Sequence, residues 1–430
     1  KPRVDFVGIE WYDDFCSVEI QKEIFSVKSE FDEIGQTKQF QEGRNKANPF
    51  EGIKREIFQN RAALKMCEID RHLNYLITQP YNGCCITYDE ECKKRQQQML
   101  TDWKNGNVDS IKLHERDMWT RELLYFADLC SGPGGFSEYF LHINKWQCRG
   151  WGFTLKGNED FKLSKFNSNA PWDNFTPEYG PSNTGDITLN ENLISFRKKV
   201  VSVSNGCHIV MADGGFDCFP NYNSQELLSR QLILCQFVCA LGILKQNGIF
   251  VCKLFDCFHP FTASILYVAC MCFDEVALIK PNQSRPANSE RYIICKGFKF
   301  GDGYNVYNKQ AHTVNEPHFI VKHLLDINMI INQQKRDKQE VDRLRKRLDL
   351  LREQNEDKVK AEENEKKTMS NDEETELLKE ITEKESRLQE VCPILPVESM
   401  PDSFKTWLRS FNEQNATRQI RHLQRIKKYL

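Results

Sequence analysis

The chain has 430 residues, of which 28% are charged, and its formal net charge is −2. A chain of this length accommodates at least one full-sized core together with an accessory region. A net charge near zero excludes a globally basic protein, so any surface that binds nucleic acid must be local. The 17 cysteines form no CxxC pair and many lie in apolar runs, so we interpret them as small buried hydrophobic residues of a reducing compartment.

The sequence shows no stretch that is long and apolar enough to span a membrane, and no signal peptide. We therefore expect a soluble, intracellular protein with no membrane partner. The sequence begins at Lys1 rather than methionine, so we expect it to be part of a longer protein. It indicates no metal site and leaves the oligomeric state open.

Residues 1–119 are predicted to form an N-terminal helical extension. Helical spacing covers Cys16–Phe31 and Asn48–Leu76, and Glu90–Trp103 is a further expected helix. Basic residues are interspersed between positions 38 and 65. Taken alone, such residues are typical of a solvated helix face.

Residues 120–300 alternate between strand and helix patterns. The alternation predicts an α/β, Rossmann-like domain with a parallel sheet, right-handed crossovers and helices on both faces. Ligands of such sheets bind beyond the carboxyl ends of the strands. The expected strands are Leu123–Ala127, Cys148–Leu155, Gly206–Asp213, Gly248–Phe255, Glu275–Lys280 and Arg291–Lys296, and the expected helices are Glu226–Leu244 and Thr262–Cys272.

Residues 301–430 are predicted to be a C-terminal helical extension. Within it, residues 333–391 are highly charged and carry two short heptad patches. We expect an antiparallel helical hairpin there, and a single long, partly disordered helix is the alternative. A last amphipathic helix is expected over Asn415–Leu430. The patches are Val341, Leu344, Leu348, Leu351 and then Leu378, Ile381, Glu385, Leu388.

The glycine-rich turn Gly132–Gly135 stands between a buried strand and the helix that opens at Phe136. Glycines at such a turn let the backbone approach a ligand, with amide groups and the helix dipole directed at it. An isolated turn of this kind is more often only a tight turn. The polar residues at later strand ends give it weight.

Three strand ends carry polar residues that a plain core does not need. Asp213 closes one strand, Lys253 interrupts an apolar strand, and Glu290 precedes the last strand. A lone buried lysine would be explained by snorkelling or a salt bridge, but the convergence of all three at one sheet edge favours a functional cluster. Asp186 follows a turn and is either a ligand contact or a helix N-cap.

Methyl transfer from a sulfonium donor to a ribose hydroxyl is a reaction that suits this set. The hydroxyl is a very weak acid, and a neutral lysine can accept its proton when a second lysine nearby opposes the charged form. Carboxylates orient the amine and balance the charge. Lys65 is the candidate for the second lysine.

The chain resembles the FtsJ-like ribose 2′-O-methyltransferases, and within them the branch that acts on capped mRNA. The similarity runs in family order from about residue 60 to 300, and NEQNATRQIRHL resembles the segment that follows the family's catalytic domain. The charged hairpin has no counterpart there. The matching stretches are NRAALKM, LYFADLCSGPGGFSEY, TLKG, DFKL, GDIT, MADGGF, FVCKLFD and SRPANSERY.

The resemblance implies a Lys-Asp-Lys-Glu tetrad in which Lys253 accepts the proton. S-adenosylmethionine is the implied donor, and 5′-capped RNA is the implied partner. One basic cap position is a lysine here, Lys54, which loses the bidentate geometry of arginine. The implied tetrad is Lys65, Asp213, Lys253 and Glu290; the donor contacts are Asn60, Cys130, Ser131, Gly132, Pro133, Gly134, Gly135, Phe136 and Asp186; the cap and nucleotide contacts are Lys28, Asp32, Arg44, Lys54, Asn223, Ser224, Gln225 and Asn288.

The function implied is a nuclear enzyme that methylates the ribose 2′-oxygen of the first transcribed nucleotide of capped mRNA. Alternatives are action on the second nucleotide, an rRNA or tRNA ribose 2′-O-methyltransferase, a catalytically inactive RNA-binding relative and a dinucleotide oxidoreductase. The last lacks the full GxGxxG spacing and gives no purpose to the two lysines. Relatives carry a G-patch, a guanylyltransferase-like domain and a WW domain that are not visible here, so docking to the RNA polymerase II tail would use domains outside this sequence.

Overall fold

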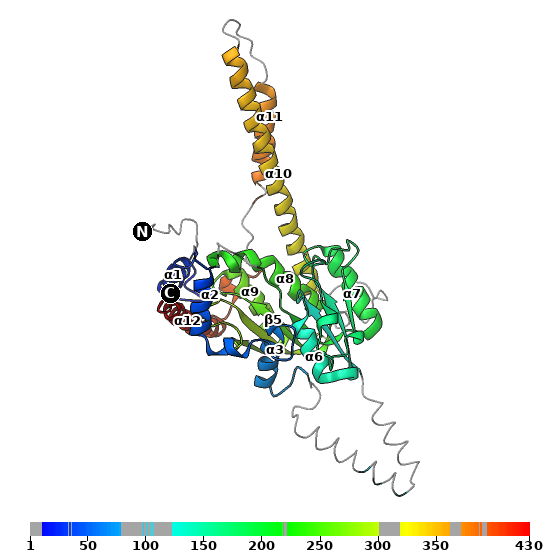
Figure 1. Cartoon of the computed structure of the whole chain (residues 1–430). Helices are drawn as coiled ribbons and strands as arrows, with labels where there is room; N and C mark the ends of the chain where they lie inside the picture. The colour runs from blue at the N-terminus through cyan, green and yellow to red at the C-terminus, as the bar shows by residue number, and fades with distance from the viewer. Residues whose placement is uncertain are drawn as a thin grey trace.

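The computed structural model describes residues 11–78, 98, 101, 105, 123–300, 319–361, 371–386, 388 and 394–430, except positions 33, 36, 217 and 219–221. The described elements form a compact body from which one helical hairpin projects (Figure 1). The helix predicted over Glu90–Trp103 lies largely outside the described residues.

A seven-stranded sheet with the order β3-β2-β1-β4-β5-β7-β6 is the centre of the body. The strands form where apolar and β-branched residues run together, and β1, β4 and most of β5 are buried on both faces, as in α/β sheets generally. The strands are β1 Leu124–Leu129, β2 Cys148–Phe153, β3 Phe175–Glu178, β4 Cys207–Ala212, β5 Leu244–Leu254, β6 Phe273–Ile279 and β7 Arg291–Phe298.

The sheet is mixed, whereas the sequence pattern predicted a parallel one. The pairs among β1 to β5 are parallel, but β7 is antiparallel to both β5 and β6. The reason is the connection: a loop, residues 280–290, joins β6 to β7 without a crossover helix, so the chain returns in the opposite direction. β3 was not predicted.

Helices cover both faces of the sheet. One buried cluster joins strand residues such as Val210 and Phe250 to α7, α8, α9 and the first part of α10, and the other joins Ile209 and Val251 to α3 and α6. α7 was not predicted. The bounds are α3 Arg61–His72, α6 Gly135–Asn144, α7 Asn190–Ser204, α8 Gln225–Ile243, α9 Pro260–Cys272 and α10 Phe319–Ala361, with short 3-10 helices η2 Lys145–Gln147, η3 Leu163–Lys165, η4 Trp172–Asn174, η5 Tyr222–Ser224 and η6 Val397–Ser399.

The N-terminal helices pack beside the C-terminal helix, α12, at one end of the sheet (Figure 1). They are α1 Val18–Ser29, α2 Lys38–Ala47 and the 3-10 helix η1 Pro49–Ile53. The continuous helix predicted over residues 48–76 is wrong, because Lys54 and Glu56 adopt positive φ angles and break it between η1 and α3. The second helix, α2, was not predicted.

α12, Asp402–Lys427, begins earlier than the predicted start at residue 415. Pro401 stands directly before it. Phe404 and Leu408, which are four residues apart and lie on the same helix face, extend the apolar face toward the N-terminus of the helix. The helix therefore reaches from the edge of the main core to the N-terminal helices.

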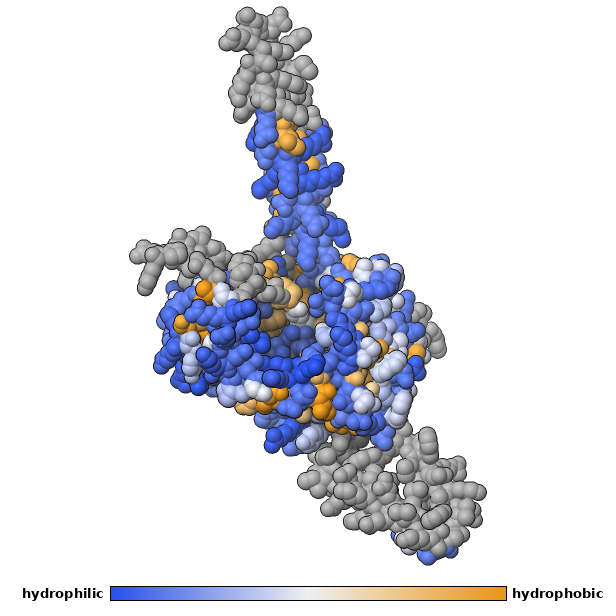
Figure 2. Space-filling model, viewed as in Figure 1, coloured by the Kyte–Doolittle hydropathy of each residue, from blue (hydrophilic) through white to orange (hydrophobic). Residues whose placement is uncertain are grey.

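The predicted antiparallel hairpin is formed by α10 and α11, the latter spanning Asn371–Ser386. Val341, Leu344 and Leu348 pack against Leu377 and Ile381 in a narrow seam. Leu377 replaces the predicted Leu378, which is 41% exposed. The described surface of the hairpin is mostly hydrophilic (Figure 2).

α8 and the adjoining η5 form one segment, Tyr222–Ile243, that is apolar and long enough to cross a membrane by composition, contrary to the sequence expectation. Of its most apolar window, 78% is buried inside the protein. The segment is thus a core helix between the sheet and α10. The described cysteines are free and mostly buried, as expected of small hydrophobic residues.

Candidate active site

Four charged side chains meet at the carboxyl end of the sheet. Asp213 directly follows β4, Lys253 lies near the end of β5, and Glu290 immediately precedes β7. Lys65 reaches the same place from the middle of α3. Their side chains are 10–16% exposed, which is enough for contact with a ligand.

The four side chains form two ion pairs. The Nζ atom of Lys65 lies 2.8 Å from the Glu290 carboxylate, and that of Lys253 lies 3.3 Å from Oδ1 of Asp213. The Tyr292 hydroxyl donates to the same Asp213 oxygen at 2.8 Å. Tyr292 was not among the predicted residues, although its place two residues after Glu290 puts it directly opposite Lys253 in the sheet register.

Electrostatics connects the two pairs. Burial disfavours the charge of Lys65, but Glu290 and then Asp213 outweigh it and raise the pKa of Lys65. Burial likewise disfavours ionised Glu290, but Lys65 and then Lys253 outweigh it and lower the pKa of Glu290. Each pair thus lies within the field of the other, and Lys65 and Glu290 stay charged at neutral pH.

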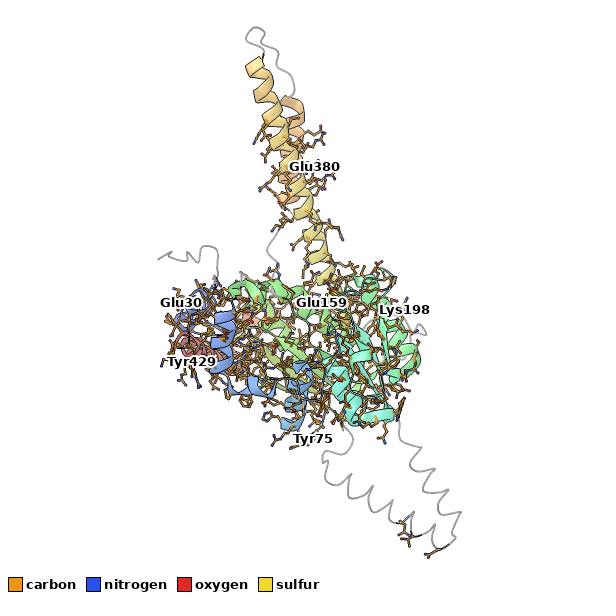
Figure 3. All side chains as sticks on the ribbon, in the orientation of Figure 1. Glu30, Tyr75, Glu159, Lys198, Glu380 and Tyr429 are labelled. Atoms are coloured by element: carbon orange, nitrogen blue, oxygen red, sulfur yellow. The ribbon has the colours of Figure 1, made fainter. Side chains whose placement is uncertain are left out.

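A cavity of about 510 Å³ opens beside this cluster. Gly215 lies over the lysine: a Cβ atom there would be 3.0 Å from the Nζ atom of Lys253. Glycine therefore keeps the amine accessible from the cavity. Glu159 also lines the cavity and is labelled near the middle of Figure 3. The full lining is Leu155, Glu159, Gly215, Phe216, Gln225, Lys253, Phe255, Asn288 and Glu290.

Protein atoms surround the glycine-rich turn after β1. A Cβ atom on Gly132 would lie 1.7 Å from the Glu159 carbonyl oxygen, and one on Gly134 would lie 2.8 Å from the Phe166 ring. One on Gly135 would lie 2.1 Å from Oδ1 of Asn60. These glycines thus allow the turn to pack tightly against its neighbours, which is a structural reason for their presence.

The other predicted donor residues differ in what they offer a ligand. Phe136 is fully buried, and Gly134 and Gly135 beside it are also buried. The Ser131 hydroxyl donates to the Leu129 carbonyl, and the Pro133 carbonyl accepts from Gln59 and Lys162. These bonds fix the backbone of the turn.

Two predicted donor contacts also serve local structure. Oδ1 of Asn60 accepts from the Ala62 amide and caps α3, and Oδ1 of Asp186 accepts from the amide and hydroxyl of Thr188. Burial, then Asp128 and Asp186, raise the pKa of the Cys130 thiol to about 12, while Lys253 opposes this. Cys130 therefore lies within the electrostatic field of Asp128, Asp186 and Lys253.

Two of the predicted substrate residues, Gln225 and Asn288, line the same cavity as Lys253. Oε1 of Gln225 accepts from the Ser289 hydroxyl at 2.8 Å, which joins α8 to the loop before β7. Asn223 and Ser224 belong to η5. The Asn223 amide nitrogen donates to the Ser29 hydroxyl at 2.8 Å and so connects this wall to α1.

Arg44 lies in a group of cations on α2, α3 and the loop before β7. Arg61 and Arg285 both form ion pairs with Glu51, the latter at 2.9 Å. Burial, then Arg285, lower the pKa of Arg44, with Glu51 opposing. Its Nε atom is buried and has no hydrogen-bond partner within the described chain. Arg61, one helical turn before Lys65, was predicted only as one of the basic residues between positions 38 and 65, and Arg285 in SRPANSERY was missed.

The remaining predicted substrate residues lie in different surroundings. Lys28 is 7% exposed and its Nζ atom lies 2.7 Å from the Asp256 carboxylate. Asp32 is partly buried, which raises its pKa. Lys54 is exposed on the turn between η1 and α3. Their contacts with a substrate stay predictions.

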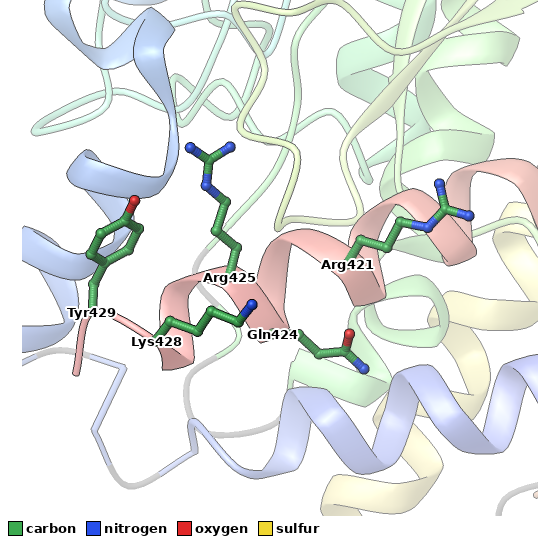
Figure 4. Close-up of a pocket in the computed structure, with 5 residues that line it drawn as sticks. All are labelled: Arg421, Gln424, Arg425, Lys428 and Tyr429. Atoms are coloured by element: carbon green, nitrogen blue, oxygen red, sulfur yellow. The ribbon is translucent and has the colours of Figure 1, made fainter.

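A second cavity, of about 490 Å³, lies along α12 (Figure 4). Arg421, Arg425 and Lys428 line it together with Gln424 and Tyr429. It contains none of the predicted site residues and belongs to the solvent-facing side of α12.

Comparisons with known proteins indicate the family of the central part of the chain. Residues 107–298 match the FtsJ-like methyltransferase family. The chain is similar to cap-specific mRNA (nucleoside-2'-O-)-methyltransferase 1 from Danio rerio, with 40% identity over 307 residues that cover 70% of this chain and 33% of that protein. The protein of that name from Homo sapiens is 42% identical over 300 residues, covering 68% of this chain and 32% of that protein.

The chain thus spans about a third of the length of the curated relatives it matches. Among solved structures, a ribosomal RNA methyltransferase from Plasmodium falciparum aligns with a TM-score of 0.29 and 18% identity, covering 44% of this chain and 95% of that chain. The assignment rests on the sequence matches. The chain therefore contains a methyltransferase domain of the FtsJ-like family.

Proposed function

We propose that this chain transfers the methyl group of S-adenosylmethionine to the ribose 2′-oxygen of the first transcribed nucleotide of 5′-capped mRNA. The observation that carries the proposal is the meeting of two lysine–carboxylate pairs at one cavity, at the carboxyl end of the sheet. The names of the curated relatives support capped mRNA as the substrate.

The donor side of the site fits S-adenosylmethionine. When bound, the donor supplies an electrophilic methyl group. Cys130, Gly132 and Pro133, the partly exposed residues of the tightly packed turn 130–136, form one wall in this proposal, and Asn60 contributes its amide nitrogen. Asp186 uses one oxygen for its local turn, and its second oxygen makes no hydrogen bond to the described part of the chain, so it can accept from a donor hydroxyl.

In this proposal Lys253, in its neutral amine form, accepts the proton of the 2′-hydroxyl and becomes the ammonium partner of Asp213. Asp213, 3.3 Å from the amine, fixes its direction, and the Tyr292 hydroxyl holds Asp213 in turn. Lys65 and Glu290 form the second wall and balance the charge. In this proposal the N-terminal extension, residues 1–119, supplies Lys65 to the catalytic domain, residues 120–300.

The cationic group around Arg44 is the proposed site of the cap triphosphate. Arg61 and Arg285 pair with one carboxylate, Glu51, and Arg44 lies within its field, so these four groups together carry a net charge of +2. Arginine binds phosphate oxygens in bidentate geometry, and the buried Nε atom of Arg44 has no hydrogen-bond partner among the described residues. Binding should therefore weaken steeply as salt increases.

The protein's partner and place in the cell follow from this substrate. We propose 5′-capped RNA as the partner and the nucleus as the location, since capped mRNA is made there. Docking to the RNA polymerase II tail is proposed for parts of the protein outside this chain.

The decisive experiment is methylation of a short capped RNA beside its uncapped counterpart, with the modified nucleotide located by mass spectrometry. We expect methyl transfer to the first nucleotide of the capped RNA and a much slower reaction without the cap. Equal turnover of both RNAs would favour an rRNA- or tRNA-type activity, and a methyl group on the second nucleotide would favour the cap-2 activity. Binding of donor and RNA without transfer would indicate an inactive relative.

A further inference from the structure

Lys280 directly follows β6 and lies beneath the loop that carries Asn288 and Glu290. Its ammonium donates to the Asn288 carbonyl at 2.8 Å, to Oδ1 of the same residue at 2.9 Å and to the Glu290 carbonyl at 2.5 Å. An ammonium group has three N–H donors, so these three oxygens use all of them. All three hydrogen bonds of the Lys280 ammonium thus go to residues 288–290.

The surroundings of Asn288 decide which way its amide faces. Oδ1 faces two donors, the Lys280 ammonium and the Ser284 hydroxyl at 3.3 Å. The amide NH₂ cannot occupy that position, because it would then face the ammonium with its own hydrogens. The nitrogen is left on the other side, and Asn288 lines the cavity beside Lys253.

Lys280 also supports Glu290, whose carboxylate binds Lys65. Lys280 donates to the backbone carbonyl of Glu290, so this hydrogen bond fixes the backbone of the residue whose carboxylate pairs with Lys65. Burial lowers the pKa of Lys280 to about 7, with Glu290 opposing. The three oxygens around the amine favour its charged form and so oppose this effect of burial.

We propose that Lys280 is a positioning residue that makes Asn288 present N–H donors to an acceptor oxygen of the RNA substrate and keeps Glu290 against Lys65. The inference rests on the proposed function and adds the polarity of this contact: the site selects an oxygen, such as that of a phosphate or a ribose, at this position.

The first test is Lys280→Met, with Lys296→Met as its matched control. Lys296 lies on β7 of the same sheet in an exposed ion pair with Glu275. A displacement of about 1 Å in a positioned group can cost on the order of a hundredfold in rate. We expect Lys280→Met to lower kcat/KM for capped RNA at least tenfold, with a donor Kd within twofold of the wild type, whereas Lys296→Met changes neither.

An unchanged kcat/KM in folded Lys280→Met would overturn the proposal. Equal losses of donor and RNA binding would also overturn it, because they would show a general structural role. Thermal unfolding of each variant identifies loss of fold, and wild-type turnover in parallel separates failure of this inference from failure of the proposed function.

Asn288→Asp provides a second test that does not depend on the stability of Lys280→Met. Aspartate keeps acceptor oxygens for Lys280 but has no N–H donors. We expect capped RNA to bind about tenfold more weakly, which corresponds to the loss of one hydrogen bond of about 1.4 kcal/mol, and we expect the loss to persist at high salt. Unchanged RNA affinity, or a loss that vanishes at high salt, would contradict the proposed donor role.

Discussion

Two clusters of charged side chains lie on either side of the start of β7, and they differ in how far their side chains are exposed. Arg291 joins a closed network in which its guanidinium contacts Asp256 at 2.7 Å, and Asp256 also binds Lys28 at 2.7 Å. The next residue, Tyr292, joins the open tetrad cluster through Asp213. The ionic side chains of the closed network are 1–7% exposed, and those of the tetrad are 10–16% exposed.

The difference shows that a lysine–carboxylate pair does not by itself mark a site. In the closed network, the Arg291 guanidinium also contacts Asn412 at 2.9 Å and the Ser289 carbonyl at 3.1 Å, so it joins β7 to α12. Lys28 adds α1 to the same network. The tetrad contains similar groups, but it borders a cavity and holds one amine beneath a glycine. Access by a ligand, rather than charge pairing, separates the two.

The largest expected effect is the loss of turnover when Lys253 of the open cluster is replaced. Lys253→Ala should reduce kcat by roughly 10²- to 10⁴-fold, because it removes the proposed proton acceptor. Donor binding, measured by calorimetry, should stay within a few-fold of the wild type. Lys245→Ala, at the other end of the same strand, is the matched control and should retain turnover. Near-normal kcat in Lys253→Ala would exclude the proposed role.

A substitution in the closed network should lower the free energy of unfolding. Asp256→Ala leaves the charges of Lys28 and Arg291 buried without their counter-ion, so we expect the free energy of unfolding to fall by about 3–5 kcal/mol. Glu275→Ala, which removes the exposed pair with Lys296, should cost about 1 kcal/mol or less. Urea unfolding measures both. Similar small losses in the two variants would show that the closed network is not a stabilising connection.

Asp128, by contrast, is a carboxylate with no cationic partner among the described residues. Asp128 is fully buried and accepts from the amide and hydroxyl of Ser137. Burial raises its pKa to about 7, whereas the lysines lower that of Glu290. Between about pH 4 and 7 the folded state therefore keeps a proton that the unfolded state has released, and stability falls as pH rises.

From pH 5 to 7 this group should lower the free energy of unfolding by on the order of 2 kcal/mol. Asp128→Asn should remove that part of the decrease, because asparagine does not titrate. Glu226, whose pKa burial raises to about 8, contributes in the same direction and stays in both proteins. Identical slopes of wild type and Asp128→Asn would show that Asp128 does not titrate in this range.

The local patterns of the sequence predicted most of the strands and core helices. Continuous apolar runs marked β1, β4 and β5, and the glycine-rich turn marked the start of α6. The direction of β7 was missed because strand pairing is decided by the route of the connecting loop and has no local signal. α2 was missed because its apolar residues are sparse among polar ones, and α7 was missed although its sequence contains several apolar residues.

The candidate site shows the same division. The sequence by itself determined that Asp213, Lys253 and Glu290 come at strand ends, since a polar residue within or beside an apolar run is a local feature. Only the tertiary structure decided that Lys65 reaches Glu290 across the fold, that Arg61 and Arg285 join Arg44, and that Lys28 pairs with Asp256. The physical reason is that ion pairs and cavities depend on distance and burial, and residues that are remote in sequence acquire both only when the chain packs.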